Sequence, residues 1–243
     1  MKILTLASRN TKEILRDPLT LFFGLGFPLV LLLLLSAIQS AIPVSLFEIE
    51  HLTPGITVFG LSFMTLFSAT IISKDRSSSL LRRLYTAPLS AADFILGYTL
   101  PIIPISLAQC VICYIAAFFL GLDPSVNVLY ATLLIIPVSL FYIALGLLCG
   151  SALNDKQVGG ICGALLTNLS AWLSGVWFDL ELVGGVFKRI ADFLPFVHAV
   201  ELERAAISGS FGDILPHLLW VLGYSVAASV AAVLIFLRQM KRQ

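Results

Sequence analysis

The segment KDRSSSLLRRLYTAPLSAAD, from Lys74 to Asp93, is a charged interruption in a chain that is otherwise strongly apolar. On a helix its apolar residues share one side and two arginines lie on the other: Leu80, Leu81, Leu84 and Tyr85 against Arg82 and Arg83. Pro88 is expected to end that helix, and a new apolar run follows. Two interpretations are open. The helix lies on anionic lipid at the membrane surface, or it docks a cytosolic partner.

The composition indicates an integral membrane protein. Of the 243 residues, 58% are hydrophobic and only 12% are charged, whereas soluble domains carry about 25% charged residues. No basic face lies outside the membrane-flanking segments, so nothing supports nucleic-acid binding. The four cysteines fall inside apolar runs, which predicts packing rather than disulfides: Cys110, Cys113, Cys149 and Cys162.

Six apolar segments reach the length of about 20 residues that a spanning helix requires. They lie near 19–41, 54–73, 98–120, 127–152, 157–178 and 214–237. Several are expected to be kinked, because prolines fall inside them: Pro28, Pro101, Pro104 and Pro137. The expected fold is therefore a single all-α polytopic membrane domain over residues 1–243.

The basic residues predict the orientation of these spans. If the N-terminus is cytoplasmic, 12 of the 15 Lys and Arg residues lie on the cytoplasmic side. The exceptions are Lys188, Arg189 and Arg204. Such an asymmetry places both termini and residues 74–93 in the cytosol. The protein is then expected in the plasma (inner) membrane.

Two further segments flank the spans. Residues 1–17 predict an amphipathic helix along the inner surface, with Asp17 and Pro18 starting the first span. Its apolar side is expected to hold Ile3, Leu4, Ala7, Thr11, Ile14 and Leu15. Residues 179–213 form the long external segment, which is rich in apolar residues and broken at Pro195. That pattern predicts two short helices that enter the outer leaflet and return.

One side of the predicted fifth span carries a stripe of small residues: Gly159, Gly160, Gly163, Thr167, Ser170, Ala171 and Ser174. Small residues let helix backbones approach closely, so the stripe predicts packing within the chain, a dimer seam or the wall of a conduit. Asn168 and Gln109 are amides inside spans and are expected to hydrogen-bond between helices. Gly146 and Gly150, in the fourth span, form a single pair of small residues four positions apart.

No catalytic group is apparent. Every Lys, Arg, Asp and Glu lies outside the assigned spans, which disfavours a proton- or ion-coupled transporter. The sequence lacks G-x-S-x-G, H-E-x-x-H and the G-x-x-x-x-G-K-[ST] loop that binds ATP. His198 and Glu201 lie one helical turn apart, but no third ligand is evident, so a metal site is not expected.

Three stretches in order resemble a type 2 ABC-transporter permease, the membrane subunit of bacterial ABC exporters. They are LRDPLTLFFGLGFPLVLLLL (Leu15–Leu34), KDRSSSLLRRLYTAPLSAADFILG (Lys74–Gly97) and LPFVHAVELERAAISG (Leu194–Gly209). The resemblance covers essentially the full chain. Family loops often carry an acidic pair and a glycine where this chain has Ser77, Ser78 and Ser79, which bears on the choice of ATPase.

The resemblance implies a permease dimer, homomeric or heteromeric, with a cytosolic ATPase subunit that holds ATP and Mg²⁺ under each half. Residues 1–17 would be the connecting helix, and Leu80 to Tyr85 would belong to the coupling helix. The external gate would include Leu194, Pro195, Phe196, His198 and Glu201. The conduit or dimer seam would include Gly160, Gly163, Thr167, Asn168, Ser170 and Ser174.

The expected function is export of an amphiphilic or hydrophobic cargo, such as a drug, lipid conjugate or lipid-linked glycan, by alternating access. Two alternatives stay open. A polytopic enzyme acting on lipids would need a catalytic constellation, and a membrane assembly scaffold would lack transport.

Overall fold

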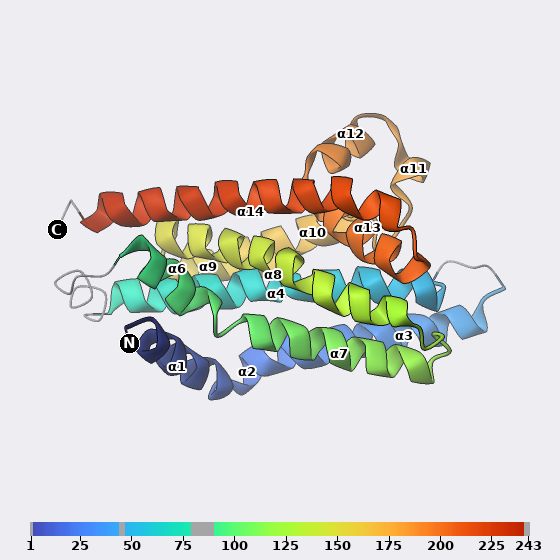
Figure 1. Cartoon of the computed structure of the whole chain (residues 1–243), viewed down its shortest axis with the longest axis horizontal. Helices are drawn as coiled ribbons and strands as arrows, with labels where there is room; N and C mark the ends of the chain where they lie inside the picture. The colour runs from blue at the N-terminus through green and yellow to red at the C-terminus, as the bar shows by residue number, and fades with distance from the viewer. Residues whose placement is uncertain (1, 44–46, 79–89, 241–243) are drawn as a thin grey trace.

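The computed structural model describes residues 2–43, 47–78 and 90–240. Within them the chain is helical, and the long helices run side by side along one axis (Figure 1). The start of α1 (Lys2–Leu15) and the end of α14 (Phe211–Met240) lie at the same end of the bundle as the end of α4 (Ile49–Ser77) and the start of α6 (Ala91–Thr99) (Figure 1). The helices α11 (Leu180–Val183) and α12 (Gly185–Phe193) lie towards the opposite end (Figure 1). The first of these ends is called the terminal end below, and the other the distal end. The predicted coupling residues Leu80 to Tyr85 lie outside the described residues.

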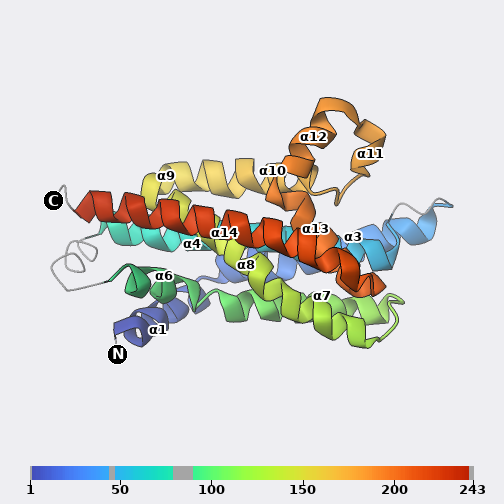
Figure 2. The ribbon, with the colours of Figure 1, turned by 45° about the horizontal axis from the view of Figure 1, so that its top comes forward.

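Five helical segments are long and apolar enough to cross a membrane: Pro18–Ala41, Ile49–Ser77, Ala92–Phe119, Val126–Ala152 and Phe211–Arg238. A further helical run follows in three consecutive pieces, α9 (Asp155–Val158), η2 (Gly159–Leu166) and α10 (Thr167–Leu173). Figure 2 shows α9 and α10 along one line. η2 is a π-helix, so this run is not one regular α-helix. It covers most of the predicted fifth span, and six crossings stay a prediction.

The first segment begins as the sequence predicts. α1 (Lys2–Leu15) ends before Asp17, whose carboxylate caps α2 (Pro18–Leu21) by accepting from the Thr20 amide at 3.2 Å. Hydrogen bonds from Thr20 lower the pKa of Asp17 below its usual value. The π-helix η1 (Phe22–Gly26) then leads into α3 (Phe27–Ala41), with Pro28 in its first turn.

Prolines divide the third segment rather than bending it. α6 (Ala91–Thr99) and α7 (Ile103–Phe119) are separate helices, with Pro101 between them and Pro104 in the first turn of α7. Pro137 lies inside α8 (Val126–Ala152), as expected for a distorted helix. Pro54 and Pro216 also lie inside helices, near the first turns of α4 and α14.

The centre of the bundle is α4 (Ile49–Ser77), which is buried along most of its length and packs most extensively against α8. The close approach depends on glycine. A Cβ on Gly146 would lie 2.5 Å from the Ser68 Cβ and 2.6 Å from the Thr65 carbonyl oxygen. Gly150 faces Ala69 in the same way, at 2.8 Å from its carbonyl oxygen. The Thr65 hydroxyl also donates to the Tyr142 carbonyl at 2.8 Å. The Gly146–Gly150 pair therefore sets the α4–α8 distance.

The distal end carries α11 (Leu180–Val183), α12 (Gly185–Phe193) and α13 (Pro195–Ser208) before α14 (Phe211–Met240). α12 and α11 form an arch that projects from the bundle (Figure 2). α13 is buried against α4, α8 and α14. Gly209 ends α13 in the left-handed region, at φ 76°, and lets the chain turn back into α14.

Candidate functional site

The candidate site is the terminal end, where two helices flank the 79–89 segment. α4 leads into that segment and α6 leads out of it, so their ends are called the stems. Ser78 caps α4, its amide donating to the Lys74 carbonyl at 3.0 Å. Ser90 and Asp93 form a capping box at the start of α6, with bonds of 2.9 and 3.1 Å. Both stems are therefore well-formed helix ends.

A partly buried ion pair joins the α4 stem to α1. Both Arg9 guanidinium nitrogens lie 2.5 Å from the Asp75 carboxylate, one on each oxygen. The Asp75 side chain is only 3% exposed, and the Tyr98 hydroxyl of α6 donates to it at 2.8 Å. Glu13 binds the same guanidinium at 2.8 Å. These four residues are called the Asp75 cluster. The hydrogen bond to Asp75 raises the pKa of Arg9 above its already high value.

A second contact ties α1 to the α6 stem. The Asn10 side chain is fully buried and donates to the Gly97 carbonyl at 3.0 Å. Gly97 has no room for a side chain, because a Cβ there would meet the Leu6 Cδ2 at 2.5 Å. α1 therefore packs directly against α6 and is bound to α4 through the Arg9–Asp75 ion pair. Both stems are held by one helix.

The last turn of α4 is also fixed to the opposite side of the bundle. The Arg76 guanidinium donates to the carbonyls of Ser151 and Leu153, at the end of α8. Carbonyls at a helix C-terminus lack intrahelical partners, and a cation satisfies them well. The Ser73 hydroxyl donates to the Asp155 carboxylate at 3.1 Å, at the start of α9. A displacement of the α4 stem would therefore reach α1, α6, α8 and α9.

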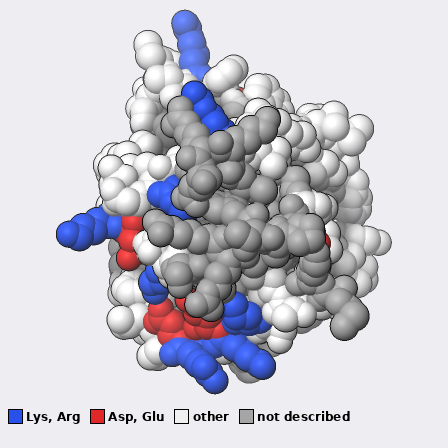
Figure 3. Space-filling view, turned by 90° about the vertical axis from the view of Figure 1, so that its left-hand side faces the viewer, with Lys and Arg blue, Asp and Glu red and all other residues white. Residues whose placement is uncertain are grey.

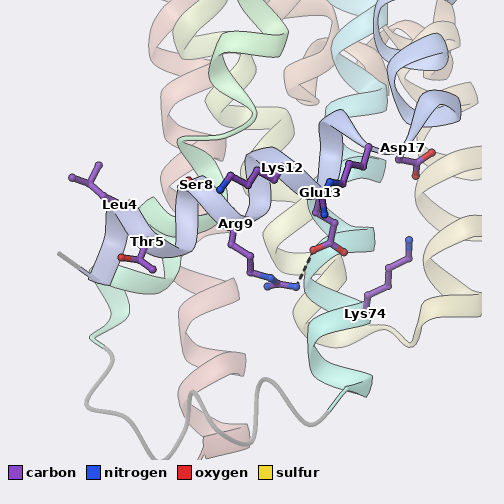
Figure 4. A pocket seen from close by; sticks show the side chains of 9 residues that line it. Leu4, Thr5, Ser8, Arg9, Lys12, Glu13, Asp17 and Lys74 are labelled. Carbon is purple, nitrogen blue, oxygen red and sulfur yellow. Dashed lines mark hydrogen bonds and ion pairs between the residues drawn. The ribbon is translucent and has the colours of Figure 1, made fainter.

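Charged side chains of both signs gather on the lower part of this end as Figure 3 shows it. α1 and the end of α4 border a groove of about 870 Å³, seen from close by in Figure 4. Its lining residues are Leu4, Thr5, Ser8, Arg9, Lys12, Glu13, Arg16, Asp17 and Lys74. Glu13 is paired with Arg9, and Asp17 caps α2. Lys12, Arg16 and Lys74 have no ion pair within the described part of the chain. The groove is thus predominantly cationic.

The buried face of α1 differs from the predicted one. Leu6, Ala7, Asn10 and Ile14 are buried, whereas Leu4 and Leu15 are 71% and 58% exposed. The reason is the contact with α6, which turns Leu6 and Asn10 inward against Gly97. Leu4 and Leu15 are left for lipid or for another protein.

The predicted small-residue stripe divides into two parts. Thr167, Ser170 and Ser174 are buried in contacts within the chain, and the Ser170 hydroxyl lies 2.7 Å from that of Tyr142. Gly163 is in van der Waals contact with Leu66, at 3.5 Å. Gly160 and Asn168 are exposed, and a Cβ on Gly160 would meet nothing within 4 Å. Only this second part of the stripe presents a surface.

Of the two amides, Gln109 joins helices as predicted and Asn168 does not. Gln109 is fully buried in α7 and donates to the Thr57 carbonyl of α4 at 3.2 Å. Asn168 donates at 2.8 Å to Ala164, one turn earlier in its own helical run. The prediction of an interhelical bond for Asn168 is therefore wrong within this chain, because its side chain lies on the outer face.

The five predicted gate residues lie around the start of α13. Leu194 is extended and caps the helix, Pro195 begins it, and Phe196 is buried against Phe141 at a ring distance of 5.9 Å. Glu201 pairs with Arg204 at 2.8 Å rather than with His198. His198 faces His217 of α14 instead. Among the described residues, no group of three His, Cys, Asp or Glu side chains is arranged to hold a metal.

Comparison with known proteins agrees with this architecture. The sequence profile of the family described as "ABC-2 type transporter" matches residues 1–207. The chain belongs to the ABC-2 type transporter family. It is 31% identical over 233 residues to a protein of Pyropia yezoensis named as a transport permease, ycf38. That match covers 90% of this chain and 79% of the relative. A Porphyra purpurea protein of the same name is 33% identical over 129 residues, covering 51% of this chain and 44% of the relative. The chain is thus a transport permease.

Several residues of this permease that the structure brings together were not singled out from the sequence. Arg9 and Asp75 are far apart in the chain, and each alone reads as an ordinary basic or acidic residue at a membrane surface. A signal for Asp75 existed, since it lies two residues after an apolar span, but its partner could not be deduced.

Glu203 is the other such group. It is fully buried in α13 and accepts one hydrogen bond from Tyr114 at 3.3 Å, and its Oε1 atom has no partner among the residues that the structure describes. Burial raises the pKa of Glu203 well above its ordinary value, although the Tyr114 bond opposes the shift. Burial therefore favours the protonated form of this carboxyl group.

Proposed function

We propose that this permease is the membrane subunit of an ATP-driven exporter and that a separate cytosolic ATPase acts on its terminal end. The observation that carries the proposal is the anchoring of both stems of the 79–89 segment. The Asp75 cluster joins the α4 stem to α1 and α6, and Arg76 joins it to α8. A partner that pushed on this segment would move these helices together.

The cytosolic assignment of the terminal end rests on charge. The start of α1, the end of α4, the start of α6 and the end of α14 share one end of the bundle (Figure 1). The positive-inside rule favours the cytosol for the end with most Lys and Arg. This orientation gives a multi-pass protein of the plasma (inner) membrane with both termini cytoplasmic. The distal arch of α11 and α12 would then lie outside.

The proposed mechanism is alternating access. Two permease protomers, identical or different, would each carry one ATPase subunit, on which ATP and Mg²⁺ are bound and hydrolysed. Closure of the ATPases would displace Leu80 to Tyr85, and α4 would carry the movement along the bundle. Its tight packing on α8 at Gly146 and Gly150, and its contacts with α13, support this role for α4. The exposed part of the stripe, Gly160 and Asn168, would face the second protomer or the conduit.

The cargo is proposed to be amphiphilic or hydrophobic, such as a drug, a lipid conjugate or a lipid-linked glycan. The helices expose mainly apolar side chains outward, and the predicted seam offers small and amide groups without charge. Efflux of a panel of amphiphiles from proteoliposomes that contain permease and ATPase tests this step. Transport of free ions alone would contradict it.

The decisive experiment compares ATP hydrolysis with transport in the reconstituted complex. Replacing Arg83 and Leu84 together by alanine is expected to leave the ATPase co-purifying weakly or hydrolysing ATP without transport. The matched control is Lys188→Ala, a surface cation at the distal end, which is expected to behave as wild type. Normal coupled transport by the Arg83/Leu84 variant would refute docking at this segment. Failure of any ATPase to co-purify with the wild-type permease would refute the proposed function.

A further inference from the structure

At the distal end, α14 holds the corner between α12 and α13 through a group of aromatic rings, called here the histidine clasp: Phe193, His198, His217, Trp220 and Tyr224. His198 and His217 approach each other with their Nδ1 atoms 2.9 Å apart. The His198 ring stacks on Trp220, with ring centroids 4.9 Å apart and planes 15° from parallel. The Tyr224 hydroxyl donates to the Phe193 carbonyl at 2.8 Å.

The geometry fixes which nitrogens carry protons. Nε2 of His198 lies 2.9 Å from the Asp192 carbonyl oxygen, which can only accept, so this nitrogen carries the hydrogen. Nδ1 of a neutral His198 is then the acceptor, and His217 must donate from its own Nδ1. The bond exists only while Nδ1 of His198 is unprotonated. A proton added there would leave two N–H groups facing each other at 2.9 Å.

The clasp tolerates a proton elsewhere. Nε2 of His217 has no hydrogen-bond partner among the described residues, so a proton on that atom leaves the Nδ1–Nδ1 bond intact. Protonation of His198 is different, because its second nitrogen is already committed to Asp192. His198 is therefore the residue on which the clasp depends.

The surrounding charges do not compensate a cation on His198. Asp192 of α12 and Glu201 of α13 are the acids whose charge reaches it, and His217 is the facing base on α14. Asp192 is bound by Lys188 at 3.1 Å, and Glu201 is bound by Arg204 at 2.8 Å. Burial lowers the pKa of His198, and His217 lowers it further, although Asp192 and Glu201 oppose the shift. His198 is thus neutral at neutral pH and accepts a proton only in acid.

We propose that the His198–His217 pair is an acid-released clasp, which frees the α12–α13 corner from α14 when Nδ1 of His198 is protonated. A histidine pair suits this task because the charge of imidazole changes within the physiological pH range. If the distal end is external, the permease responds to external pH. That consequence rests on the proposed function, whereas the clasp itself does not.

Trp220 offers a direct readout, because the His198 ring stacks on its indole and leaves it when the clasp opens. Trp172 and Trp177 are the other tryptophans, so the Trp172→Phe/Trp177→Phe chain in lipid nanodiscs reports Trp220 alone. Titration from pH 8 to 5 is expected to change the Trp220 emission at least twofold in a single transition, with a midpoint below the ordinary histidine value of about 6.5. His198→Gln is expected to abolish the transition, and His217→Gln to move its midpoint upward. His51→Gln, at the third histidine, is the matched control and should leave the curve unchanged.

Hydrogen exchange shows whether protonation opens the corner. Peptides that cover residues 185–200 of the otherwise unmodified chain are compared at pH 7.5 and 5.5, after correction for intrinsic exchange rates. Their protection is expected to fall at least threefold in acid in wild type and to stay constant in His198→Gln. An unchanged Trp220 titration in His198→Gln, or equal protection of wild type at both pH values, would overturn the proposal. Neither measurement requires an ATPase or a cargo, so a failure of the proposed function would be seen separately.

Discussion

The Asp75 cluster predicts an asymmetry between two substitutions that break the same ion pair. The Asp75 side chain is 3% exposed, whereas that of Arg9 is 37% exposed and also binds Glu13. Arg9→Ala leaves a buried carboxylate with Tyr98 as its remaining side-chain partner among the described residues. Losing a charged hydrogen bond of this kind costs about 2–3 kcal/mol. Asp75→Asn leaves a guanidinium that can turn to water and Glu13, so we expect a cost of about 1 kcal/mol.

Thermal unfolding of the purified permease measures these costs. In a chain of this length, about 1 kcal/mol shifts the Tm by roughly 2–4 °C, so Arg9→Ala is expected to lower it by roughly 4–12 °C. The double variant should lose less than the sum of the single losses, because its buried charge is gone. Arg16→Ala is the matched control, since Arg16 lines the same groove without an ion pair among the described residues. If Asp75→Asn costs more than Arg9→Ala, or Arg9→Ala behaves like the control, the assignment of the cluster as a clamp is refuted.

Three further outcomes are expected. Gly146→Ala should lower the Tm, because overpacking of the α4–α8 contact costs about 1–3 kcal/mol, whereas Gly160→Ala should be neutral or stabilising. Asp17→Ala should lower the free energy of unfolding by about 1 kcal/mol, because the α2 cap is lost. The pKa of Asp17 is lowered in the fold, so wild type loses this advantage over the variant as the pH falls below about 4. Glu203→Gln should become increasingly more stable than wild type between pH 5 and 8, because the raised pKa means that wild type loses stability as the pH rises above the unfolded value of about 4.3. Tm measurements across pH test all three, and equal pH dependence in wild type and Glu203→Gln would contradict the last.

Much of the fold was readable from the sequence because the bilayer imposes length and composition on each span. The approximate positions of the spanning segments, the Asp17–Pro18 start of the first span and the break at Pro195 all follow from local rules. One element does not follow from those rules. The π-helix η2 interrupts the predicted fifth span, and no local propensity in Gly159 to Leu166 indicates it.

The sequence did not predict which residues distant in the chain would contact each other. Leu6 and Asn10, rather than Leu4, face inward because α1 meets α6 at Gly97, where a missing side chain lets the two helices touch. Asn168 looked like a partner for another helix but lies on the outer face of its own. A helical wheel shows which residues share a side and leaves undetermined which side meets a neighbour.

The sequence by itself determined that this permease is a membrane bundle of helices, because the length and hydropathy of each span are local properties of the chain. Only the tertiary structure decided three contacts. Arg9 forms an ion pair with Asp75, His198 forms a hydrogen bond with His217, and the buried Glu203 accepts a hydrogen bond from Tyr114. These contacts join residues on different helices, and their energies depend on burial and on distances of a few ångströms. Both quantities arise only when the helices pack.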